Sequence, residues 1–77
     1  LEYNNRGSIN KAIEHYLEVL RLKPDYEEAH NNLGISFYLR GNTGKALVHF
    51  RKALSINPNY VPAINNLKKA LMQQEKL

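Results

Sequence analysis

Histidine and asparagine are the side chains of this sequence whose types and spacing suggest chemistry. Three histidines could provide nitrogen ligands for a metal ion, and three pairs of adjacent asparagines could hydrogen-bond to a peptide backbone. His15 and His49 lie 34 residues apart, and so do Asn32 and Asn66. Either interpretation therefore depends on where a 34-residue spacing places these side chains in the fold.

A shift of 34 residues aligns the chain with itself along its whole length. Eight of the 26 pairs between residues 1–26 and 35–60 are identical. They are Arg6/Arg40, Gly7/Gly41, Lys11/Lys45, Ala12/Ala46, His15/His49, Leu20/Leu54, Pro24/Pro58 and Tyr26/Tyr60. A fixed period of this length is typical of stacked repeats, in which each unit leaves an apolar face for its neighbour to cover.

Size and composition limit the classes of protein to consider. The chain has 77 residues, no cysteine and a net charge of +4, which suit one small domain without disulfides or thiolate metal sites. No apolar run approaches the ~20 residues that span a bilayer. The basic residues are scattered, without a stripe of interleaved exposed aromatics, so we expect neither a membrane nor a nucleic-acid partner. The lack of cysteine weakly favours a cytoplasmic location, and a start at Leu1 without methionine suggests an excerpt from a longer protein.

Apolar residues recur at spacings of three and four, which predicts α-helices near residues 9–22, 27–40, 43–56 and 61–75. Gly41 supplies a tight turn between two of them, and Pro58 ends the helix before it. Leu1–Arg6 are then the tail of an earlier helix.

Helix starts are also visible in the sequence. Asp25 with Glu28 three residues later reads as a capping box. Ser8 and Asn42 are candidates for N-caps, and Pro62 lies in a first turn, where its missing N–H costs nothing.

Small residues predict how the helices pack. Gly34 and Ala46 sit where an antiparallel pair of helices would approach closely, and Phe37 and Phe50 would fill the space beside them. Ala53 leaves room for the next unit's first helix.

At these residues the chain resembles tetratricopeptide repeat proteins. The family pattern places a bulky residue, Leu-Gly and an aromatic in the first helix, a glycine at the turn, then Ala, an aromatic, Ala and a closing Pro. The unit 27–60 supplies His30, Leu33, Gly34, Phe37, Gly41, Ala46, Phe50, Ala53 and Pro58. Only His30 departs, because the family prefers a larger side chain there. The preceding unit keeps Tyr3, Gly7, Ala12, Tyr16 and Pro24, and the last segment has Lys68 where a glycine is expected.

The resemblance implies an all-α fold, a right-handed superhelix (α-solenoid) of antiparallel helix-turn-helix repeats. Residues 1–26 are then a partial repeat, made of the end of a first helix and a second helix. Residues 27–60 are a complete repeat, and residues 61–77 a C-terminal capping helix. The implied function is a non-catalytic module that binds a peptide or a partner protein in its concave groove, without a cofactor. The alternative is the substrate-holding domain of a larger enzyme, such as an O-linked sugar transferase.

The resemblance also places the first helix of each pair along the concave groove. The positions that would bind a peptide there are Asn32, Ile35, Tyr38, Leu39, Asn65, Asn66, Lys69 and Gln73. Asn4 and Asn5 would extend this strip. Asn32 and Asn66 would stand side by side, and they resemble the asparagine ladder in the repeat domains of protein O-linked N-acetylglucosamine transferases. The alternative is that they are solvated asparagines, common in the family. The lysines and arginine of a two-carboxylate clamp are missing from the matching positions.

Other sites are not indicated. His15 and His49 belong to different helix pairs, about 10 Å apart by typical helix spacing. We expect both to be surface residues, His30 to be a packing residue, and no metal to bind. No Ser/His/Asp set presents itself, and the run GNTG at residues 41–44 lacks both the preceding strand and the Gly-Lys-Ser/Thr ending of a phosphate loop. We also expect self-association through the N-terminal edge, where Tyr3, Ala12 and Tyr16 would leave apolar surface uncovered.

Overall fold

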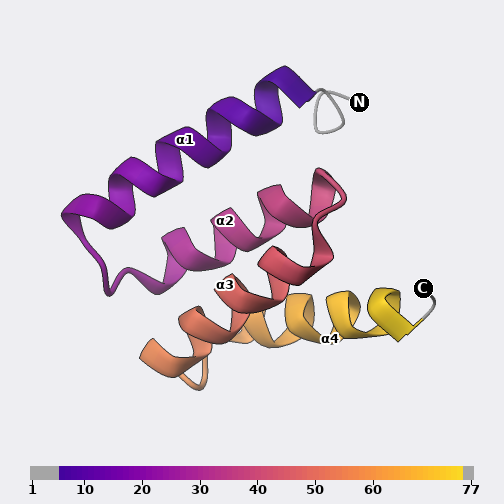
Figure 1. The fold of residues 1–77 in the computed structure, drawn as a ribbon. Helices are drawn as coiled ribbons and strands as arrows, with labels where there is room; N and C mark the ends of the chain where they lie inside the picture. The colour runs from indigo at the N-terminus through magenta and orange to yellow at the C-terminus, as the bar shows by residue number, and fades with distance from the viewer. Residues whose placement is uncertain (1–5, 76–77) are drawn as a thin grey trace.

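The computed structural model describes residues 6–75, which fold into four α-helices (Figure 1). Helix α1 spans Arg6–Leu22, α2 spans Glu27–Leu39, α3 spans Thr43–Ile56 and α4 spans Val61–Glu75. Consecutive helices run in opposite directions, and the described residues contain no strand. The all-α class with antiparallel helices, predicted from the sequence, is confirmed.

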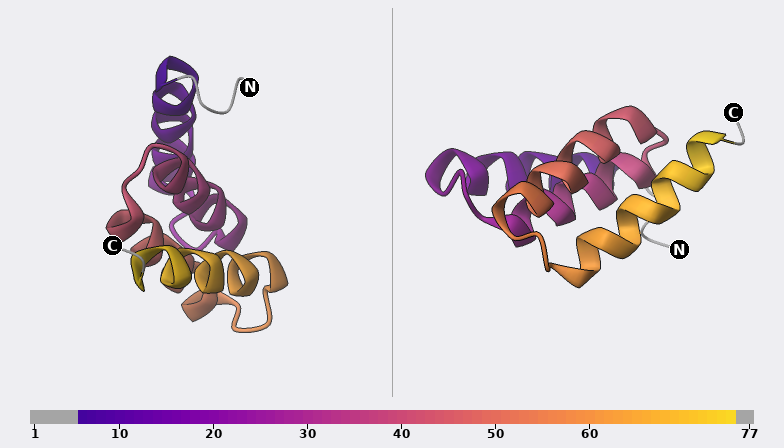
Figure 2. Two further views of the ribbon diagram at one scale, coloured as in Figure 1. Left: turned by 90° about the vertical axis from the view of Figure 1, so that its right-hand side faces the viewer. Right: turned by 90° about the horizontal axis from the view of Figure 1, so that it is seen from below.

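Helix α2 is the centre of the arrangement. It contacts each of the other three helices, and α3 also packs against α4. Helices α1 and α4 lie at opposite ends of the stack, so each has one face that no described helix covers (Figure 2). The fold is therefore a layered series of helices rather than a closed bundle.

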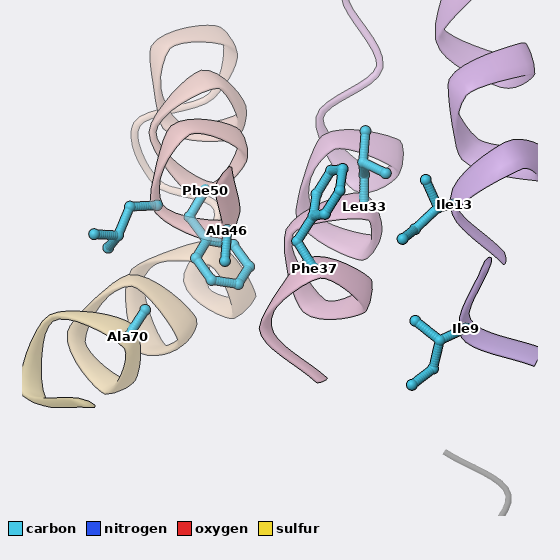
Figure 3. Close-up of a cluster of buried hydrophobic side chains, with 8 residues drawn as sticks. Ile9, Ile13, Leu33, Phe37, Ala46, Phe50 and Ala70 are labelled. Atoms are coloured by element: carbon cyan, nitrogen blue, oxygen red, sulfur yellow. The ribbon is translucent and has the colours of Figure 1, made fainter. Parts of the chain in front are cut away.

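The core is a single cluster that runs through all four helices. Figure 3 shows α1 and α3 directing side chains toward α2 from its two sides, with α4 reaching the same cluster. Its buried members are Ile9, Ile13, Leu33, Phe37, Ala46, Leu47, Phe50 and Ala70. A chain of this size buries only about 60–65% of its unfolded surface, so each large member of this cluster matters to stability.

Gly34 allows α2 and α3 to approach closely. A Cβ atom added at Gly34 would lie 2.5 Å from Cε1 of Phe50, closer than real Cβ contacts come. Ala46 on α3 is fully buried as well. The close approach predicted from Gly34 and Ala46 is therefore confirmed, because only a residue without a side chain fits against the Phe50 ring.

The turn between α2 and α3 follows the prediction. Gly41 has φ = 90°, a backbone conformation that favours glycine. Asn42 is the N-cap of α3, and its side-chain oxygen accepts a hydrogen bond from the Lys45 backbone N–H at 3.1 Å. Pro58 follows the C-cap Asn57, and Pro62 lies in the first turn of α4, both as predicted.

Two predicted helix starts are wrong. Helix α1 already includes Arg6, Gly7 and Ser8, so Ser8 is not an N-cap and Arg6 does not belong to an earlier helix. Glycine permits a turn but does not require one, and at Gly7 the chain takes the helical conformation. The remaining residues of that supposed helix tail, 1–5, lie outside the described residues.

The capping box at Asp25 is also wrong. The N-cap of α2 is Tyr26, whose side chain makes no cap hydrogen bond, and Asp25 lies one residue outside it. Instead the Tyr26 hydroxyl donates to Glu28 Oε1 at 2.7 Å. Glu27 and Glu28 place negative charge in the first turn, where it stabilises the positive end of the helix dipole.

Candidate functional site

The predicted groove positions all lie on α2 and α4, the two first helices of the repeat pattern. These helices contact each other directly, although 21 residues separate Leu39 from Val61 in sequence. We call the surface that they form together the α2–α4 surface. It brings side chains from two successive repeats onto one face of the molecule.

Asparagine amides join the two helices of this surface. Asn66 Nδ2 donates to Asn31 Oδ1 at 3.0 Å. Asn31 is buried, Asn32 and Asn66 are half-buried, and Asn65 is exposed. The structure thus pairs Asn66 with Asn31, a residue that sequence reasoning did not assign to the site. A primary amide carries two N–H donors and an acceptor oxygen, so Asn66 keeps hydrogen-bonding capacity beyond this bond.

Three of the predicted groove residues line a hollow on the other side of α2. Asn32, Ile35 and Leu39 face α1 across a groove of about 310 Å³. The remaining lining residues are Ser8, Ile9, Ala12, Tyr16 and Ser36. We call this feature the α1–α2 groove. Its lining is mainly apolar, and it coincides with the N-terminal edge where the sequence predicts uncovered apolar surface.

The other predicted groove residues lie nearer α4. Tyr38 and Gln73 line one hollow of about 320 Å³ with Gly41 and Thr43. Lys69 is exposed on α4, and Leu39 is 40% exposed on α2. The predicted set therefore divides between the α1–α2 groove and the α2–α4 surface. Asn4 and Asn5 lie outside the described residues, as does Tyr3.

Two of the histidines form a pair that sequence reasoning missed. His30 on α2 and His49 on α3 place their Nδ1 atoms 3.3 Å apart. His30 Nε2 lies 3.0 Å from the Pro24 carbonyl oxygen. A carbonyl can only accept, so His30 donates from Nε2, and when both rings are neutral its Nδ1 accepts a hydrogen bond from the Nδ1–H of His49. His49 is thus half-buried rather than a surface residue, which corrects the expectation. His30 packs as expected.

A signal for this pair was present in the sequence. His30 occupies the bulky position of the first helix, which faces the second helix, and His49 immediately precedes the core residue Phe50. His49 also stacks on Phe37, with ring centroids 5.6 Å apart. His15, its equivalent one repeat earlier, is exposed. Equal positions in the repeat therefore do not give equal burial among the described residues, because His49 packs against His30 and Phe37 of α2.

Burial, followed by the nearby positive charges of His30, Lys52 and Lys45, lowers the pKa of His49 from 6.5 to about 4. The folded state therefore favours the neutral ring. The free energy of unfolding is therefore undiminished by His49 above about pH 6.5. It decreases as the pH falls toward 4, because His49 binds a proton in the unfolded chain while it stays neutral in the folded protein. It follows that the histidine pair makes the fold sensitive to acid.

We expect the wild-type protein to lose more stability than the variant His49→Gln when the pH falls from about 7.5 to about 4.5. The extra loss should be roughly 1 to 2 kcal/mol, after allowance for the partial exposure of the ring. Urea unfolding at the two pH values measures it. His15→Gln, at the exposed equivalent position, should keep the wild-type pH dependence. An identical acid response in wild type and His49→Gln would disprove this role.

Metal chemistry has little support in the described part of the chain. Residues 6–75 contain no group of three or more His, Cys, Asp or Glu side chains placed to hold an ion. Both facing nitrogens of the histidine pair are engaged with each other, and Lys45 and Lys52 add positive charge nearby. The arrangement can pack and hydrogen-bond, and no buried side-chain nitrogen or oxygen in the described residues lacks a hydrogen-bond partner.

No helix within residues 6–75 is long and apolar enough to cross a membrane. A comparison with curated proteins finds no match. Two family models do match, one described as "TPR repeat" over residues 1–41 and one as "Tetratricopeptide repeat" over residues 27–60. Repeats of this kind generally mediate protein–protein interactions and are typically non-catalytic. The first model covers more than half of the chain, and the helical hairpins fit it: this chain belongs to the tetratricopeptide repeat family.

Proposed function

We propose that this protein is a non-catalytic interaction module that binds an extended peptide or a segment of a partner protein on its α2–α4 surface. The observation that carries the proposal is the combination of amides and exposed apolar groups on two adjacent first helices. Asn65 and Asn66 can bond a peptide backbone, while Tyr38, in the hollow that Gln73 also lines, can contact its side chains.

The bond between Asn31 and Asn66 supports this function by fixing the two helices to each other. A binding surface made from two rigid helices loses little entropy when a ligand binds. The lysines and arginine of a carboxylate clamp are missing from the matching positions, so we propose that the surface recognises the peptide backbone and apolar side chains. The units 1–26, 27–60 and 61–77 would act as successive parts of one such surface.

A peptide selected from a random display library provides the probe for this proposal. We expect Tyr38→Ala and Asn65→Ala each to weaken its binding roughly fivefold or more, since each removes about 1 kcal/mol of contact. Isothermal titration calorimetry measures the change. Arg51→Ala, an exposed position on α3, is the control and should leave the affinity unchanged. If all three variants bind equally well, the α2–α4 surface is not the binding site.

The same binding surface could serve a larger enzyme by holding its substrate. The asparagines at equivalent positions, Asn32 and Asn66, favour this second candidate, because backbone contacts would hold many substrates alike. The full-length gene separates the two proposals, since a transferase domain in the same chain supports the second.

A further inference from the structure

The α1–α2 groove has a counterpart in this same structure. Adding 34 to its residue numbers gives positions on α3 and α4, and the corresponding groove between those two helices is the one against which α2 packs. The main correspondences are Ala12 with Ala46, Tyr16 with Phe50, Asn32 with Asn66, and Leu39 with Gln73. The two grooves differ in burial. Ala46 and Phe50 are 0% and 1% exposed, whereas Ala12 and Tyr16 are only half-buried.

Helix α2 shows what a groove of this kind accepts. It places Gly34 against the ring of Phe50 and bonds Asn31 to Asn66. Tyr38 of α2 reaches the hollow that Gln73 also lines. The occupant is therefore an α-helix with a small residue, an amide and a large side chain on one side.

The helix that corresponds to α2 after the same shift is α4. Its Asn65 corresponds to Asn31, its Met72 to Tyr38, and its Lys68 to Gly34. Asn65, Lys68 and Met72 are all exposed, so α4 presents this side to solvent.

We propose that the α1–α2 groove is the docking site for helix α4 of a second copy of this chain, and that Lys68 keeps this head-to-tail association weak. Helix α4 of one copy and α1 of the next would then form the same antiparallel pair that α2 forms with α3. This inference does not depend on the peptide-binding function proposed above.

Two side-chain pairs favour this docking. By correspondence with the bonded pair Asn31 and Asn66, Asn65 of one copy would face Asn32 of the next. By correspondence with Tyr38 and Gln73, Met72 would face Leu39. Met72 is 61% exposed and Leu39 is 40% exposed in the single chain, so docking would remove apolar surface from water on both sides.

Lys68 opposes the docking. At Gly34 even a Cβ atom would lie 2.5 Å from the facing Phe50 ring, and the corresponding ring in the α1–α2 groove is that of Tyr16. A lysine there must push the incoming helix outward, because both its Cβ and the four-carbon chain beyond it need room beside the ring. The single misfitting residue thus limits growth of an open chain of copies, which a head-to-tail contact would otherwise produce.

Sedimentation equilibrium without any ligand tests this inference. Lys68→Gly removes the misfit and should tighten self-association roughly ten- to a hundredfold over wild type. Lys69→Gly is the matched control, with the same loss of charge and helix propensity on a neighbouring exposed residue, and should not tighten it. Adding Ala12→Arg to Lys68→Gly should block the groove and restore the weak association.

Equal association constants for Lys68→Gly and Lys69→Gly would overturn the inference, as would association that Ala12→Arg does not reduce. A closed dimer unaffected by Lys68→Gly would show that two α1–α2 grooves pair face to face instead.

If circular dichroism shows that Lys68→Gly lowers the helix content, Lys68→Ala decides the question. It shortens the misfitting side chain, keeps the helix propensity and should give a smaller tightening. No tightening in Lys68→Ala would then overturn the inference.

Discussion

Replacing Phe50 with alanine should leave this protein largely unfolded at room temperature. The Phe50 side chain is 1% exposed and lies in the cluster shared by all four helices. Truncating such a residue costs about 3 to 5 kcal/mol, from lost transfer energy and from the cavity that remains. That loss is comparable to the whole stability that a domain of fewer than about 80 residues obtains from its core. Circular dichroism during thermal and urea unfolding measures it.

Tyr16→Ala is the matched control for this variant. Tyr16 occupies the corresponding position one repeat earlier, but it is only half-buried beside the α1–α2 groove. We therefore expect it to lose about 1 to 2 kcal/mol, well below the loss at Phe50. Equal losses at the two positions would contradict the burial pattern of the structure, in which α2 covers one aromatic ring and no described helix covers the other.

Replacing Gly34 with leucine should destabilise the fold by about 3 kcal/mol, although leucine is among the best helix formers. The cause is steric, since even a Cβ at this position lies 2.5 Å from the Phe50 ring. Alanine should have a smaller destabilising effect, because the gain in helix propensity offsets part of the clash. Urea unfolding of the glycine, alanine and leucine forms should rank them in that order of stability.

Gly44 is the control for this series. It lies in the first turn of α3, is exposed, and an added Cβ would come no closer than 3.8 Å to Asn42 Oδ1. Gly44→Ala should therefore stabilise the protein by about 0.5 to 1 kcal/mol through helix propensity alone. A stabilising Gly34→Ala of the same size would show that α2 and α3 do not approach closely.

The sequence predicts the helices, most of their ends and the core because these depend on local rules and on a period. Gly41 adopts a positive φ at the turn, where other residues would be strained, and Asn42 is a favourable N-cap for the helix that follows it. Phe37 and Phe50 recur with small residues at helical spacings, which identifies the face that each helix buries. The start of α1 was misplaced because Gly7 and Ser8 are weak helix formers that favour a helix start, and tertiary context overrides such local preferences.

The pairings across helices could not be predicted in the same way. Asn31 and Asn32 are adjacent, and about 100° of helix rotation separates them, so only the packing of α2 on α4 decides which one meets Asn66. The contact between His30 and His49 likewise depends on how α2 and α3 are rotated against each other. A repeat period fixes which positions are equivalent, but it does not fix which side chains touch between units.

Helix α2 lies in the groove between α3 and α4, with Gly34 against Phe50 and Asn31 bonded to Asn66. A NOESY spectrum of the isotopically labelled protein tests both contacts at once. The account predicts cross-peaks from the Gly34 α-protons to the Phe50 ring and from the Asn66 side-chain amide to protons of Asn31. A folded, helical sample in which both sets of cross-peaks are missing would contradict it.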